Sequence, residues 1–132
     1  MQLVNRSIEK KEGNASIFLS TVQTAVALGN CEDGRELADR IADGLLQIVV
    51  RDNSELTVNI FCKNHRLEIM EDLPVPVRAR IEYANVTVAA GIMSGFLNQF
   101  VLTVHEDYVV RGFIPMIDAF EKLLYRANSY IN

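Results

Sequence analysis

The feature that most restricts the fold of this chain is an alternation of apolar and polar residues, which begins near residue 56. Residues 56–63, 67–70 and 75–83 carry apolar side chains at every second position. This spacing predicts β-strands, because successive side chains of a strand point to opposite faces. Asn64 and His65 form the predicted turn between the first two strands, and two prolines separate the second strand from the third. The apolar row of the third strand consists of Val75, Val77, Ala79, Ile81 and Tyr83.

Helical spacing of apolar residues predicts two helices on either side of these strands. One amphipathic helix is expected over residues 34–50, where Asp33 and Glu36 have the spacing of a capping box. A second helix is expected over residues 86–99, with Asn85 as its N-cap.

The stretch FVLTVHEDYVVRGFIP, Phe100–Pro115, predicts a hairpin with strands at 100–105 and 108–114. Pro115 suits the start of a last amphipathic helix, because proline is favoured in the first helical turn. From residue 34 the order is therefore α-β-β-β-α-β-β-α. This order predicts an α+β fold, an antiparallel sheet packed by helices.

The first 33 residues form an N-terminal extension whose structure the sequence leaves open. Residues 1–14 are polar and predict a loose arm, or at best an edge strand, before a single α+β domain over residues 15–132. Residues 15–28 suit a helix capped by Asn14, but their β-branched residues also suit a strand.

The composition indicates which classes of partner the protein can bind and in which cellular compartment it is expected. The 132-residue chain carries a net charge of −4, and its basic residues are too sparse to form the basic face of a nucleic-acid-binding protein. Its apolar stretches are too short to span a bilayer. Two cysteines, Cys31 and Cys62, are too few for a disulfide framework. We therefore expect a cytoplasmic protein with reduced thiols, without nucleic-acid or membrane partners.

Residues typical of catalysis do not combine into a recognisable motif. His65 and His105 fall at predicted turns, and with Cys62 they would form a metal site only if the two hairpin tips met. Cys62 reads as a small core residue, and carboxylates next to Cys31 disfavour its thiolate. No phosphate-binding glycine motif is present. We predict no catalytic residue, metal or cofactor, and a non-enzymatic protein.

Gly91 and Gly95 lie one helical turn apart in the predicted second helix. Glycine costs about 1 kcal/mol relative to alanine inside a helix, so two of them suggest close packing there. Their small-residue face suits either close contact with the chain's own sheet or close approach of a partner subunit.

The pattern of residues 84–131, ANVTVAAGIMSGFLNQFVLTVHEDYVVRGFIPMIDAFEKLLYRANSYI, resembles the class I type III secretion chaperones. A related sensory-transduction-regulator fold of bacteria shares this layout. The resemblance implies a homodimer that holds a secreted or regulated polypeptide by strand addition and apolar patches. It implies partner contacts at Phe61, Met70 and Tyr108 and a dimer interface at Gly91, Gly95 and Phe96.

Three functional hypotheses remain open at this point. The first is a small acidic chaperone or adaptor, and the second is a regulatory or sensor domain that binds a folded partner or a small ligand. The third is an enzyme with a site at the hairpin tips. Exposed apolar surface favours the first, and a closed concave pocket favours the second.

Overall fold

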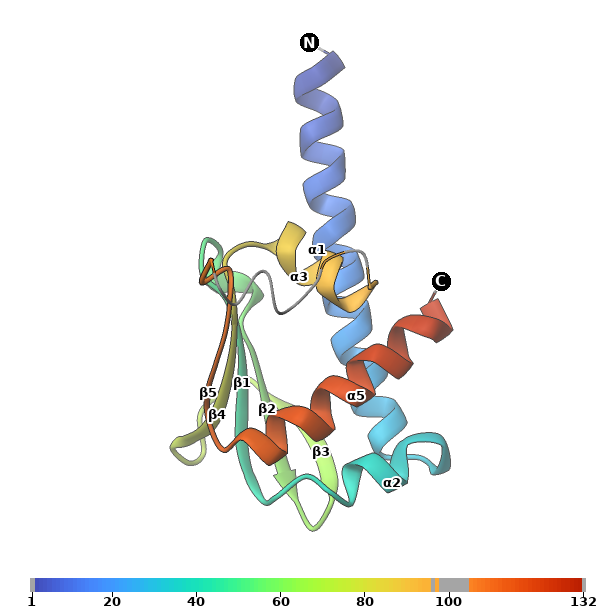
Figure 1. Cartoon of the computed structure of the whole chain (residues 1–132), viewed down its shortest axis with the longest axis vertical. Coiled ribbons are helices and arrows are strands. Elements are labelled where there is room, and N and C mark those ends of the chain that lie inside the picture. The colour runs from blue at the N-terminus through green and yellow to red at the C-terminus, as the bar shows by residue number, and fades with distance from the viewer. Residues whose placement is uncertain (1, 96, 98–104, 132) are drawn as a thin grey trace.

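The structure, a computed structural model, is an α+β fold in which helices cover one face of a five-stranded sheet (Figure 1). It describes residues 2–95, 97 and 105–131, and of residues 2–12 only the backbone. The elements are α1 (Gln2–Gly29), η1 (Glu32–Gly34), α2 (Arg35–Ala38), β1 (Gly44–Val50), η2 (Ser54–Leu56), β2 (Val58–Lys63), β3 (Arg66–Met70), β4 (Val77–Tyr83), α3 (Val86–Met93), β5 (Tyr108–Gly112) and α5 (Ile114–Ile131). The predicted α+β class, a sheet packed by helices, is confirmed, although the sheet is mixed and not antiparallel throughout.

The strand order is β3-β2-β1-β4-β5. β1 and β4 pair in parallel, whereas β1–β2, β2–β3 and β4–β5 pair antiparallel. β1 and β4 therefore occupy the centre of the sheet, and Tyr83 at the end of β4 pairs with Tyr108 at the start of β5.

The predicted helix over residues 34–50 is wrong. A short 3-10 turn and the four-residue α2 are followed by a strand, β1, which begins at Gly44 with a φ of +141°. Leu45 and Leu46, neighbours in β1, are both buried, and the pairing of β1 with β4 shifts register between them. The apolar residues of this strand therefore show no regular alternation in the sequence that would distinguish it from a helix.

α1 resolves the ambiguity over residues 15–28 in favour of a helix. Its buried side chains recur at helical spacing, at Phe18, Val22, Ala25 and Val26. The helix starts at Gln2 and extends away from the sheet in Figure 1, so the loose arm or edge strand and the cap at Asn14 are wrong. The Asn14 side chain instead donates to Thr87 Oγ1 of α3, at 3.2 Å. The division of the chain at residue 14 stays a prediction.

Most of the remaining predicted elements are confirmed, but the helix expected over residues 86–99 is shorter, since α3 ends at Met93 and Gly95 has a φ of +81°. Asn64 and His65 have φ angles of 52° and 65°, as the tight turn between β2 and β3 requires. Asn85 caps α3, since its Oδ1 accepts the Val88 N–H at 2.9 Å. The predicted strand at 100–105 falls almost wholly on residues outside the described part of the chain, whereas β5 and α5 lie where the second strand and last helix were expected.

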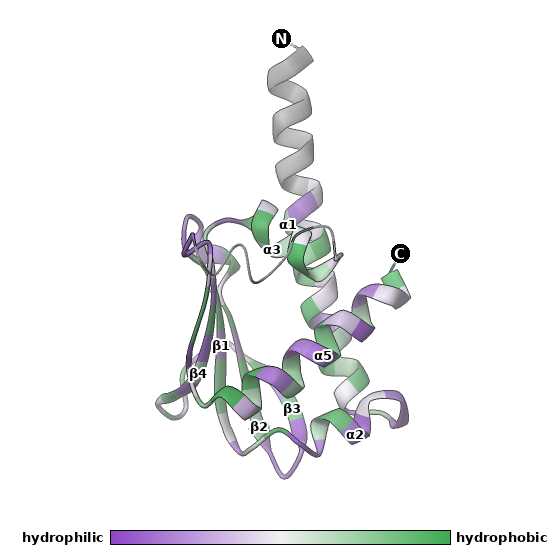
Figure 2. Cartoon of the chain, in the orientation of Figure 1, coloured by the Kyte–Doolittle hydropathy of each residue, from purple (hydrophilic) through white to green (hydrophobic). Residues whose placement is uncertain are grey.

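The core lies between the sheet and the helices α1, α3 and α5. Hydrophobic residues recur along the strands and on α1 and α5 among hydrophilic ones (Figure 2). Phe18 of α1 meets Tyr83 of β4 edge to face, with ring centroids 6.3 Å apart. The buried side chains of α5 include Met116, Ile117, Phe120, Leu123, Leu124 and Ala127.

Candidate functional site

A small cavity lies where the end of β4 meets α3 and α5. Its volume is about 30 Å³. We call it the α3–α5 cavity. It is lined by Tyr83, Ile92, Met93, Glu121, Leu124 and Tyr125.

Local sequence explains why these three elements converge. β4 ends at Tyr83, and Asn85 caps α3 two residues later, so the chain turns directly from strand into helix. On α5, Glu121 and Leu124 lie three residues apart and therefore share one face of the helix. The Glu121 carboxylate therefore lies beside the apolar side chains of Ile92, Met93 and Leu124.

Three polar side chains meet in this apolar setting. The Tyr108 hydroxyl donates to Glu121 Oε2 at 2.5 Å. The Tyr83 ring lies beside the Tyr108 ring, with centroids 5.7 Å apart. Tyr83 is 1% exposed.

Burial fixes the protonation of both tyrosines. Loss of solvent raises the pKa of Tyr83 and of Tyr108 far above the ordinary value of 10.0, and the negative charge of Glu121 raises both further. Both phenols consequently remain hydrogen-bond donors at any physiological pH.

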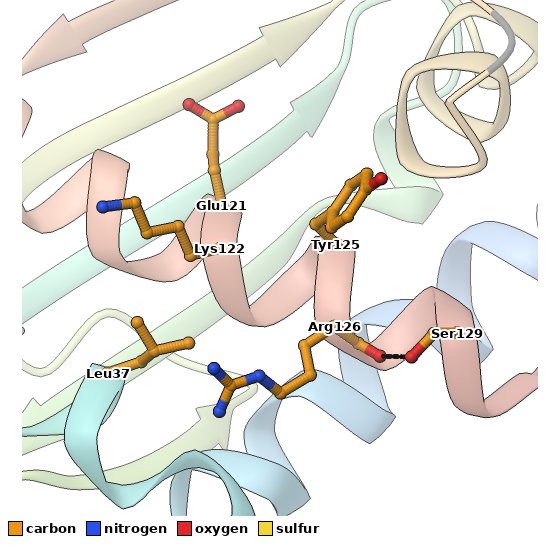
Figure 3. A pocket seen from close by; sticks show the side chains of 6 residues that line it. All are labelled: Leu37, Glu121, Lys122, Tyr125, Arg126 and Ser129. Carbon is orange, nitrogen blue, oxygen red and sulfur yellow. Dashed lines mark hydrogen bonds between the residues drawn. The ribbon is translucent and has the colours of Figure 1, made fainter.

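A larger groove shares part of its lining with the cavity. We call it the α2–α5 groove, and its volume is about 580 Å³. Figure 3 shows its residues, Leu37, Glu121, Lys122, Tyr125, Arg126 and Ser129. Glu121 and Tyr125 point toward the strands and α3, and Arg126 extends toward Leu37 of α2. Because Glu121 and Tyr125 also line the cavity, the two spaces adjoin on either side of these residues.

The three side chains predicted to contact a partner do not form one surface. Phe61 lies half-buried on the face of the sheet away from the helices, where it borders a separate groove of about 580 Å³ with Val75 of the β3–β4 connection. Met70 is half-buried at the end of β3. Tyr108 is 6% exposed and lies on the opposite, helix-covered face, where it contacts Glu121.

The residues predicted at a dimer interface lie around the end of α3. A Cβ atom at Gly91 would clash with the side chain of Leu97 in the same chain, so Gly91 accommodates an internal contact. Gly95 has a φ of +81°, and a Cβ atom at this position would meet no atom of the described residues within 4 Å. Phe96 lies outside the described residues.

The histidine and cysteine side chains do not converge. His65 lies in the turn between β2 and β3, at the end of the sheet where β1 begins. His105 lies three residues before Tyr108, at the opposite end of the sheet, where β1 finishes. Burial, with a smaller effect of Asp43, raises the pKa of the Cys62 thiol to about 11. In the part of the chain that the structure describes, no group of three or more His, Cys, Asp or Glu side chains is placed to hold a metal ion.

None of the described helices combines the length and the hydropathy needed to cross a bilayer.

Comparison with known proteins identifies the fold. No protein-family model matches the sequence, and no curated protein matches it either. A solved structure described as "UbiJ-SCP2 Ubiquinone synthesis protein" matches with a TM-score of 0.59 and 13% identity, over 90% of this chain and 91% of that one. The sterol carrier protein domain 2 of Helicoverpa armigera matches with a TM-score of 0.57 and 15% identity, over 78% and 80% of the two chains. Sterol carrier protein 2 of Yarrowia lipolytica matches with a TM-score of 0.53 and 16% identity, over 84% and 93%.

The chain has the fold of the sterol carrier proteins. The predicted resemblance to class I type III secretion chaperones and to sensory-transduction regulators is therefore wrong. The secreted or regulated polypeptide partner, the secretion-chaperone role and the homodimer were implied by that resemblance and are wrong with it. The resemblance depended on element order, and the helix at 34–50 that began that order is in fact strand β1.

Sequence reasoning missed Glu121, Tyr83 and Tyr125 as site residues. Glu121 gave a usable signal, since it stands four residues after Ile117 and three before Leu124, inside the buried stripe of the last helix. Tyr83 gave a weaker one, as the sole hydroxyl in the predicted apolar row of the third strand.

Proposed function

We propose that this protein is a non-enzymatic binding domain that holds an apolar, lipid-like ligand at the α3–α5 cavity and the adjoining α2–α5 groove. The observation that carries the proposal is the position of the two spaces, which adjoin at α5, the helix that packs across the sheet. Ligand sites are typically concave, largely apolar and furnished with a few converging polar groups. Ile92, Met93 and Leu124 supply the apolar part here, and Glu121 and the tyrosines supply the polar part.

Two further observations support this proposal. The groove, at about 580 Å³, falls within the range of roughly 300–1,000 Å³ usual for small-molecule sites. The structures that share the fold are named for sterol carriage and for ubiquinone synthesis, and both sterols and ubiquinone are apolar molecules. A small-ligand-binding domain was the second of the hypotheses that the sequence left open.

We also propose that the protein acts in the cytoplasm. Cys31 and Cys62 are both free thiols, and Cys31 is exposed. An exposed free thiol suits a reducing compartment.

The proposal is tested by titrating the full chain with parinaryl alcohol, a fluorescent lipid with a conjugated tetraene chain. We expect saturable binding that weakens about tenfold in Tyr125→Ala, because a groove wall loses an aromatic side chain. Tyr130→Ala is the matched control, since Tyr130 is also an exposed tyrosine of α5 but does not line the groove. Absence of saturable binding, or equal weakening in both folded variants, would contradict the proposed site.

A further inference from the structure

We propose that this protein docks onto bilayers that contain anionic phospholipids, through a basic and apolar surface on the face of the sheet away from the helices. The inference goes beyond the proposed function, because this surface shares no lining residue with the α3–α5 cavity or the α2–α5 groove. It follows from the charge of the surface and from the apolar side chains exposed at its border.

Two adjoining spaces form this surface, which we call the open-face surface. One is the groove of about 580 Å³ beside Phe61, and the other is a pocket of about 150 Å³ at the pair β4–β5. Val77 and Arg78 line both spaces, so the surface is continuous. The other charged side chains of its lining are Asp43, Lys63, Arg80 and Arg111.

The charge of the open-face surface is opposite to that of the whole chain. Its lining contains four basic side chains and one acidic side chain, Asp43, whereas the chain carries a net charge of −4. Arg80 and Arg111 are neighbours across the β4–β5 pairing, and Arg78 borders the same pocket. A positive surface on an acidic protein attracts anionic partners.

Acidic side chains near the surface offset only part of this charge. Glu82 lies 3.6 and 3.9 Å from two arginines of the pocket. On the edge strand β3, Arg66 and Glu68 face the same side as the surface and cancel each other. Residues 71–72, the acidic pair that begins the β3–β4 connection, line neither space. The open-face surface therefore keeps a positive charge.

Exposed apolar side chains border the basic ones. Leu73 and Val75 of the β3–β4 connection are 53% and 39% exposed, and Phe113 and Ile114 at the start of α5 are 39% and 44% exposed. The two segments meet at Arg78, which lines the groove with Val75 and lies over the Phe113 ring, 4.4 Å from its centroid. An exposed apolar patch with a charged rim is typical of a protein or membrane interaction site.

An anionic bilayer fits both features of the surface. Basic side chains are attracted to anionic headgroups, while apolar side chains enter the boundary between headgroups and acyl chains. Lysine and arginine can reach the lipid phosphates while their aliphatic stems lie along apolar surface. Docking of this kind needs no spanning helix. The expected lack of a membrane partner rested on the length of the apolar stretches, which has no bearing on surface docking.

The open-face surface and the proposed ligand site are connected by α5. Ile114 begins this helix at the border of the surface, and Glu121, about two turns further along, lines both ligand spaces. Docking would therefore hold the helix that lines the ligand site at the membrane by its first turn.

Co-sedimentation of the full chain with lipid vesicles tests this inference. We compare vesicles of phosphatidylcholine alone with vesicles of phosphatidylcholine and phosphatidylglycerol. At an ionic strength of about 0.1 M we expect at least about tenfold tighter binding to the vesicles that contain phosphatidylglycerol. Most of this preference should disappear at about 1 M, because the Debye length falls from about 10 to about 3 Å.

Two charge variants locate the electrostatic contact. Lys63→Gln/Arg111→Gln removes two exposed basic side chains of the surface and should weaken binding to the anionic vesicles about tenfold or more. The matched control is Arg35→Gln/Arg51→Gln, which changes the net charge equally. Arg35 lies on α2, and Arg51 follows the opposite end of β1. The control should bind within about threefold of the wild type, because its charges lie away from the contact.

A second pair of variants locates the apolar contact. Leu73→Ser/Val75→Ser should weaken vesicle binding about tenfold and leave the preference for anionic lipid in place. The control is Tyr130→Ser/Ile131→Ser, which alters two exposed apolar residues at the far end of α5, on the other side of the molecule from β4 and β5 (Figure 1). Its vesicle binding should match that of the wild type.

Several results would overturn this inference. Equal binding of the wild type to both kinds of vesicle, or an anionic preference that persists at high ionic strength, would refute it without any variant. Equal weakening in a variant and in its matched control would show that the contact lies elsewhere. Titration with parinaryl alcohol keeps the two proposals apart. Loss of alcohol binding with vesicle docking intact refutes the proposed function alone, and the reverse result refutes the docking surface alone.

Discussion

Replacing Tyr108 with phenylalanine removes one hydroxyl from the buried polar cluster and keeps the aromatic ring that lies against Tyr83. The lost hydrogen bond is the one to Glu121 Oε2, at 2.5 Å, and Tyr108 is only 6% exposed. Hydrogen bonds to charged groups contribute about 1.5–3 kcal/mol to stability. We therefore expect Tyr108→Phe to lower the free energy of unfolding by about 2 kcal/mol at neutral pH.

The same substitution should change how stability depends on alkaline pH. The pKa of Tyr108 is raised in the folded protein above its ordinary value of 10.0, first by burial and then by Glu121. Its protonated hydroxyl thus contributes stability that is complete below pH 10.0 and is lost as the pH rises above it, because the unfolded chain ionises first. The loss amounts to about 1.4 kcal/mol per pH unit. Tyr83 adds an equal slope to both proteins, so it does not affect their difference.

Urea unfolding followed by circular dichroism tests both parts. The wild type should exceed Tyr108→Phe by about 2 kcal/mol at neutral pH, and this difference should nearly close within one to two units above pH 10. Tyr125→Phe is the control, since Tyr125 is 72% exposed and its hydroxyl should contribute less than about 0.5 kcal/mol at neutral pH. A difference that stays constant from neutral to alkaline pH would show that the Tyr108 hydroxyl is not held in its protonated form by the fold.

Two further predictions concern the frame around the site. Gly112→Ala should lower the free energy of unfolding by about 2–4 kcal/mol, because Gly112 has a φ of +91° and a Cβ atom there would clash with the Arg78 carbonyl oxygen. Gly13→Ala, in open space on α1, should instead raise the free energy of unfolding by about 0.5–1 kcal/mol. Thermal unfolding distinguishes the two signs. Cys31 should react at once with a thiol reagent such as DTNB, whereas Cys62, fully buried with its pKa raised to about 11, should react only as fast as the protein unfolds; rapid reaction of two thiols in the native protein would contradict this.

The part of the fold that could be predicted from the sequence is the part with one solvent-facing side. β2 and β3 lie toward one edge of the sheet, and in their sequences apolar residues alternate with polar ones over most positions, as is typical of strands with one covered face. β1 occupies the centre, and its run GLLQIVV is apolar at five of seven positions, so the alternation of its burial from Leu46 to Val50 is not visible in the sequence. Its partner β4 lies more than 30 residues away in a parallel pairing, which no local pattern indicates. The error over residues 34–50 follows from this, and the mistaken chaperone resemblance follows from the error.

The candidate site was only partly accessible to sequence reasoning for a similar reason. Tyr83 and Tyr108 were each visible as aromatic residues of predicted strands, but their contact depends on the register of β4 with β5. Glu121 stands out only through its hydrogen bond with Tyr108, since an acidic residue on an amphipathic helix is ordinarily solvated. A polar cluster assembled from three elements is a property of the tertiary structure, and the sequence could show its members only one at a time.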